Sequence, residues 1–195
     1  MAPLAPFTPP LGPQPPNPHY YSPTQTTLHM KEKVFSLSGD DFTVKTAEGM
    51  EVCRCKGKVL SVRDKKQFTD VNGKLIFSLG NKMLSIHKSF HAESKEGYDF
   101  EVKGHFKLIG SASSVEFKNA ADGQKVELEV KGDWFDRSAD IKWGGREVAS
   151  ISRSYFNVRQ IFGDKQSVCC ICGQLEEMML TWSCSTMLRW HPMSI

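Results

Sequence analysis

The sequence predicts an antiparallel all-β domain from Lys31 to about residue 166. Apolar and polar residues alternate there with a period of two, which is typical of strands with one buried and one solvated face. Glycine follows Asn, Asp or Glu at recurring intervals, as tight hairpins require. No stretch before Ser167 has the apolar spacing of an amphipathic helix. Together these features favour a meander of hairpins, and hence a barrel or a sandwich.

The chain begins with a proline-rich arm, which we assign to residues 1–26. Nine of the ten prolines lie there, and proline at this density predicts a disordered, polyproline-like segment. Pro13 and Pro16 have the PxxP spacing that aromatic grooves of partner proteins bind. The sequence leaves two interpretations open, a solvated tail and a docking arm for a protein partner.

Strand alternation is clearest in residues 98–108 and 125–134. The residues expected to face inward are Phe100, Val102, Phe106 and Leu108 in the first segment, and Val126, Leu128, Val130 and Trp134 in the second. Lysines and acids occupy the alternate positions, as a solvated face requires. Turn signals stand near residues 38, 47, 71, 95, 121 and 144.

Composition narrows the class of protein. The net charge is +3 and the pI about 8.5, a mild excess that does not predict a nucleic-acid partner. No apolar run reaches the length of a transmembrane helix, and the start lacks the pattern of a signal peptide. We therefore expect a cytosolic or nuclear protein with free thiols, and we assign it to the cytoplasm. Cys53 and Cys55 fall on one strand face, either as core residues or as a reactive pair.

The sequence contains no motif that specifies an enzyme. A phosphate-binding glycine loop, a nucleophile elbow and an HExxH motif are all missing, so we expect neither catalysis nor a cofactor. His87 and His91 are four residues apart, which on a strand separates them by about 13 Å and suits surface histidines better than a metal pair. In the tail, Cys169, Cys172, Cys184 and His191 have a spacing that matches no common zinc module, and we expect no metal site.

A basic cluster is the candidate binding site. It consists of Lys56, Lys58, Arg63, Lys65 and Lys66, with Asp64 as the acid among them. Each cation near an anionic membrane surface contributes about 1 kcal/mol. The cluster is either a contact for anionic phospholipid headgroups or a solubilising hairpin.

Four ordered segments resemble the LURP-one-related family: "LHMKEKVFSLSGDDFTVKTAEG", "FTDVNGKLIFSLGNKMLSIHKSF", "LEVKGDWFDRSADI" and "VASISRSYFNVRQIFGDKQ". This family belongs to the tubby C-terminal-domain-like superfamily, with the phospholipid scramblases. The resemblance covers residues 27–166 and implies a closed antiparallel β-barrel around a hydrophobic C-terminal helix. It brings no catalytic residues.

The resemblance also shapes the expected function. It implies a non-enzymatic intracellular module, peripheral at the membrane, that binds phosphoinositides or other lipids or acts as an adaptor. Two alternatives stay open, a protein-interaction scaffold without lipid binding and a scramblase-like activity. The acidic calcium-binding segment of scramblases has no counterpart in this sequence.

Residues 167–195 depart from the family pattern. After a segment like "IFGDKQ" the family continues with one more strand, a turn and an apolar central helix, and we expect this chain to lack them. Glu176 and Glu177 stand opposite the apolar positions of the tail, and two buried glutamates would be costly inside a barrel. The codons of Met178 and Met179, read in a shifted frame, permit an aspartate-containing turn like that of the family, so we hypothesise a frame change near Ser167. A barrel without its central helix should be unstable or aggregation-prone.

Overall fold

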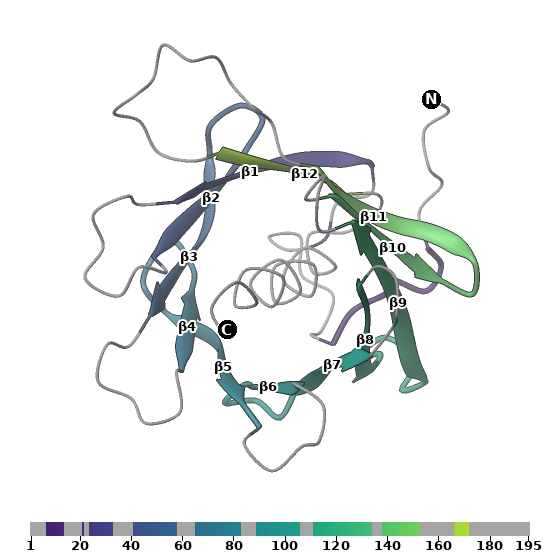
Figure 1. Ribbon diagram of the computed structural model, residues 1–195. Helices are drawn as coiled ribbons and strands as arrows, with labels where there is room; N and C mark the ends of the chain where they lie inside the picture. The colour runs from purple at the N-terminus through teal and green to yellow at the C-terminus, as the bar shows by residue number, and fades with distance from the viewer. Residues whose placement is uncertain are drawn as a thin grey trace, which may run out of the picture.

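The computed structural model describes residues 7–13, 21, 24–32, 41–57, 65–82, 89–105, 111–133, 138–152 and 166–171. In these residues the chain forms a closed barrel of twelve antiparallel strands (Figure 1). The described part contains strands and turns and no helix. The all-β prediction is therefore confirmed, and the architecture is a barrel rather than a sandwich.

The strands have the following bounds. The first six are β1 (Thr26–Glu32), β2 (Phe42–Thr46), β3 (Glu51–Gly57), β4 (Lys66–Thr69), β5 (Leu75–Asn81) and β6 (Ser89–Glu93). The second six are β7 (Phe100–His105), β8 (Ser111–Lys118), β9 (Lys125–Asp133), β10 (Ser138–Trp143), β11 (Arg146–Ser152) and β12 (Gln166–Ile171). Each strand pairs with its neighbour in the chain, and β12 closes the ring by pairing with both β11 and β1.

The position of β12 corrects the predicted C-terminal boundary of the barrel. We expected the barrel to end at Gln166 and the last strand of the family to be missing, but residues 166–171 form that strand. In the register, Cys169 lies opposite Leu28 on β1 and Ile151 on β11. Without this strand, both neighbours would present open edges of unpaired backbone groups, so pairing favours it even where the side-chain pattern is weak. The expectations for residues 172–195 lie outside the described residues.

Alternate residues of the strands line the interior, as the sequence predicted. Phe100 and Val102 on β7 are 3% and 0% exposed. On β9, Val126, Leu128 and Val130 are at most 2% exposed. Phe106, Leu108 and Trp134 lie outside the described residues. Because the described lining residues of β1 to β11 are shielded from solvent, they do not line an open, water-filled barrel.

Tight glycine turns join the strands at one end of the barrel, which we call the hairpin end. The glycines of the predicted turns have positive φ: Gly49, Gly73, Gly97, Gly123, Gly144 and Gly145. At Gly73 the φ is 82°, and the preceding Asp70 accepts hydrogen bonds from the N–H groups of Asn72 and Lys74 at 2.9 and 2.8 Å. An aspartate followed by a left-handed glycine is a turn that the local sequence specifies by itself. The turn predicted near residue 38 lies outside the described residues.

The prediction that the whole proline-rich arm is disordered was wrong for residues 7–13, which we call the docked arm. Phe7 is 7% and Leu11 1% exposed, and both belong to the core cluster. Pro13, the first residue of the PxxP spacing, is also buried, and Pro16 lies outside the described residues. The prediction of disorder rested on the number of prolines. Two apolar side chains among them, Phe7 and Leu11, are buried and hold this segment in place.

Candidate functional site

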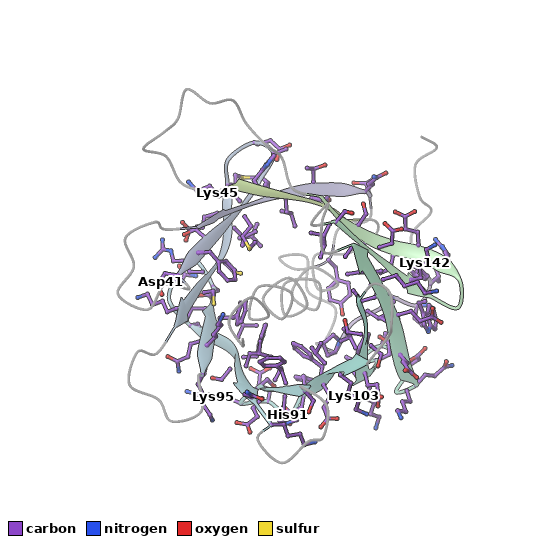
Figure 2. The ribbon with its side chains drawn as sticks, viewed as in Figure 1. Asp41, Lys45, His91, Lys95, Lys103 and Lys142 are labelled. Atoms are coloured by element: carbon purple, nitrogen blue, oxygen red, sulfur yellow. The ribbon has the colours of Figure 1, made fainter. Side chains whose placement is uncertain are left out.

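The outer face of the barrel carries two groups of charges with different pairing. The first, which we call the paired network, runs across the outer face from β5 to β9. It contains Lys82, Glu101, Lys103, Glu116 and Lys125. Figure 2 shows Lys103 on the outside of the ribbon in this region.

Lys103 is the centre of the paired network. Its Nζ lies 2.6 Å from Glu116 Oε1 and 3.6 Å from Glu101 Oε2. The Lys103 hydrogen bond holds the pKa of Glu116 below its ordinary value, and the same bond raises the pKa of Lys103. A hydrogen bond from Lys82 lowers the pKa of Glu101 in the same way. Each of these lysines therefore has a carboxylate partner, and none offers an uncompensated charge to an anion.

His91 lies at the edge of the paired network. Its ring nitrogens are 3.8 Å from Asp99 Oδ2 and 3.9 Å from Glu101 Oε1. The side chain is 34% exposed, as expected for a surface histidine. His87 lies outside the described residues.

The second group, which we call the cationic face, lies on the outside of β2 and β3 and just before β4. It consists of Lys45, Arg54, Lys56 and Lys65. Lys45 points away from the barrel (Figure 2), and both Lys45 and Lys56 are exposed. Arg54 pairs with Glu51, and Lys65 Nζ lies 3.5 Å from Glu93 Oε2.

Pairing distinguishes Lys45 and Lys56 from the lysines of the paired network. Within the described part of the chain, no carboxylate lies at ion-pair distance from either ammonium group. Arg54 and Lys56 project from the same face of β3, two residues apart, which places them about 7 Å from one another along the strand. The cationic face therefore presents several positive charges within the width of a few headgroups.

The structure divides the predicted basic cluster. Lys56 is exposed and Lys65 is half-exposed, but Lys66 is only 4% exposed, so the prediction that it contacts headgroups was wrong. Neighbouring residues of a strand face opposite sides, and Lys66 shares its side with the core residue Phe68. Lys58 and Arg63 lie outside the described residues.

Sequence reasoning missed Lys45 and Arg54. Both stand at alternate, outward positions of their strands, and the register places Arg54 beside Thr43, two residues from Lys45. The cluster was sought as a run of neighbours in sequence, whereas a sheet gathers charges from different strands. The alternation of residues 42–46 and 51–57 was the signal that could have found them.

Cys53 and Cys55 are core residues, 0% and 1% exposed. Burial raises the pKa of the Cys53 thiol far above its ordinary value, so the reactive-pair interpretation is not supported. The described residues hold no group of three or more His, Cys, Asp or Glu placed to bind a metal ion. No helix in the described part is long and apolar enough to cross a membrane.

Comparison with known proteins identifies the family. The sequence model of the LURP-one-related family matches residues 26–171. Protein LURP-one-related 15 of Arabidopsis thaliana is 26% identical over 159 residues, which are 77% of this chain and 73% of that protein. Protein LURP1 of the same plant is 24% identical over 135 residues, 66% of this chain and 65% of that protein.

A solved structure supports the fold independently. The X-ray structure of an Arabidopsis thaliana protein matches with a TM-score of 0.52 at 15% identity, covering 87% of this chain and 93% of the other. At this identity the likeness concerns the fold alone, and the fold is a tubby-like β-barrel. The family match begins at the first residue of β1 and ends at the last residue of β12. The chain therefore belongs to the LURP-one-related family, and its twelve-stranded barrel is the domain that defines the match.

Proposed function

We propose that this protein is a non-enzymatic, intracellular module that binds anionic membrane surfaces through its cationic face, with phosphoinositide headgroups as the preferred ligand. The observation that carries the proposal is the pairing difference on the outer surface. Lys45 and Lys56 are exposed and have no carboxylate partner in the described residues, whereas the lysines of the paired network form ion pairs with carboxylates.

The expected interaction is reversible and depends on salt. Each cation near an anionic leaflet contributes about 1 kcal/mol, so four of them supply about 4 kcal/mol before the costs of binding. Arg54 and Lys65 contribute less of this binding energy, because each already has an acidic partner. Such a module would bind strongly only to membranes rich in charge, and phosphoinositides concentrate several charges on one headgroup. Because the Debye length is about 8 Å at physiological ionic strength, added salt should weaken the contact.

Liposome flotation tests the proposal. The wild-type protein should float with phosphoinositide-containing vesicles and not with neutral ones. Replacing Lys45 and Lys56 together by Gln removes about 2 kcal/mol, which corresponds to about thirtyfold weaker binding. A matched control replaces Lys125 and Lys131 by Gln, which removes the same charge from lysines that have acidic partners.

Two outcomes would contradict the proposal. Binding that is equal in the Lys45/Lys56 variant and the control would show that the cationic face is not the contact. Absence of lipid dependence in the wild-type protein would favour the scaffold alternative. Flotation over a range of salt concentrations checks the mechanism, because headgroup binding must weaken as salt is added.

A further inference from the structure

The docked arm occupies a defined site at the hairpin end of the barrel, which we call the arm seat. The seat consists of Asn119 and Ala120 in the β8–β9 connection and of Trp143 and Arg146 at the β10–β11 hairpin. In Figure 1 the purple arm segment lies beside the strands β8 to β10. The two parts of the seat come from neighbouring hairpins, so one short segment can contact both.

Main-chain hydrogen bonds fix the arm at Gly12. Its N–H donates to Asn119 Oδ1 at 2.9 Å, and its carbonyl accepts from the Ala120 N–H at 2.8 Å. Asn119 is 2% exposed, and its own amide group donates to Asp122 Oδ1 at 2.8 Å. The turn therefore holds the Asn119 side chain in the orientation that receives the arm. These hydrogen bonds involve only the main chain of the arm, so they do not depend on its side chains.

Side chains supply the selectivity of the arm seat. The Phe7 ring lies 5.5 Å from the Trp143 ring, and the Arg146 guanidinium lies 4.0 Å from its centroid. Leu11 enters the core cluster. Between these anchors, Thr8 and Pro9 are exposed. The arm thus contacts the seat through two anchor residues, Phe7 and Leu11, with a bent proline-containing segment between them.

The barrel does not require the arm for closure. All twelve strands have partners on both sides without it, so the arm adds to a complete barrel. We propose that the arm seat is a peptide-binding site for proline-rich segments of a partner protein that carry an aromatic residue before the prolines and a leucine after them. The chain's own arm is the resident ligand and shields the site until it is displaced.

Tethering sets the strength of this shielding. A ligand on the same chain as its site can have an effective concentration of about 1 mM. A free peptide of the same sequence must therefore reach about millimolar concentration to displace half of the arm. A partner displaces it at lower concentration only if it makes additional contacts elsewhere.

Fluorescence anisotropy with a labelled peptide of residues 5–13 tests the proposal. The full chain carrying Phe7→Ala and Leu11→Ala should release its arm, so the peptide should reach half-saturation at a concentration at least about tenfold lower than with wild type. Thr8→Ala is the matched control, because Thr8 is exposed and should leave the shielding unchanged. Binding to the released variant should weaken about tenfold when Trp143→Ala is added.

A change in the peptide provides a test that does not depend on folding of the double variant. A peptide with alanine in place of its phenylalanine should bind the single variant Phe7→Ala about tenfold more weakly than the native peptide. Equal binding of the two peptides, or no saturable binding to either variant with an intact circular dichroism spectrum, would overturn the proposal. Concentration-dependent dimers of the wild type that disappear in Phe7→Ala would support the seat, with a second copy as the source of the segment.

Discussion

A column of four contacting aromatic rings gives the sharpest test of how the barrel is stabilised. Phe68 is 0% and Phe77 1% exposed, and their ring centroids are 4.3 Å apart. Phe42 contacts the Phe68 ring edge-on at 5.9 Å, and Phe100 contacts the Phe77 ring at 5.1 Å. The rings belong to β2, β4, β5 and β7, so one column joins strands across almost half of the ring.

Phe68→Ala should therefore destabilise the protein strongly. Truncation of a buried phenylalanine costs about 3–5 kcal/mol, and Phe68 loses contacts with two rings, which places it toward the upper value. Since the free energy of unfolding of a domain is about 5–15 kcal/mol, this is a large fraction of the total. With a urea slope of about 2 kcal/mol/M, the midpoint should fall by about 2 M.

Urea unfolding followed by circular dichroism measures this shift. Met50→Ala is the control, because Met50 is 65% exposed and its truncation should change stability by less than about 0.5 kcal/mol. A shift below about 0.5 M for Phe68→Ala, with an unchanged slope, would refute the argument that the column is tightly packed. The wild-type curve also tests the expectation of an unstable chain, which a cooperative transition would contradict.

Two further predictions concern the surface and the turns. Pairing lowers the pKa of Glu116, so its contribution to the free energy of unfolding is present above the ordinary value of 4.5 and is lost as the pH falls through the lower folded pKa. In unfolding midpoints measured between about pH 6 and 3, Glu116→Gln should reduce the loss of stability at acid pH. An identical pH profile of the variant and the wild type would contradict this. Gly73→Ala should lower the free energy of unfolding by about 1–2 kcal/mol, and Gly73→Asn should lower it less. No atom lies within 4 Å of the added Cβ, so only the positive φ disfavours a side chain there. Equal unfolding midpoints for the two variants would show that the backbone conformation is not the cause.

The sequence predicted the parts of the fold that depend on local chemistry. Alternation placed Phe100 and Val102 inside because a strand that faces a core on one side must repeat every two residues. The turn at Gly73 followed from an aspartate and a glycine that specify it within a few residues. These features need no knowledge of distant partners, which is why they could be derived.

The features that sequence reasoning missed depend on distant partners. Strand β12 is specified by the backbone edges of β1 and β11, and its own sequence pattern does not predict a strand. Phe7 is held by Trp143, which a composition count cannot anticipate. Lys66 was placed on the surface because a run of cations was read as one cluster, although adjacent strand residues face opposite sides.

The ring order of the strands separates the two proposed sites. The cationic face lies on β2 to β4, and the arm seat lies on β8 to β11, across the barrel from it (Figure 1). A lipid surface and a proline-rich segment would therefore contact opposite sides of the molecule, and neither would obstruct the other. Release of the docked arm should leave flotation unchanged, so a variant that loses both activities has lost the barrel rather than one site. Because the two sites are separate, each proposal can fail without deciding the other. Under both proposals together, the barrel would act as an adaptor between a membrane and a partner protein.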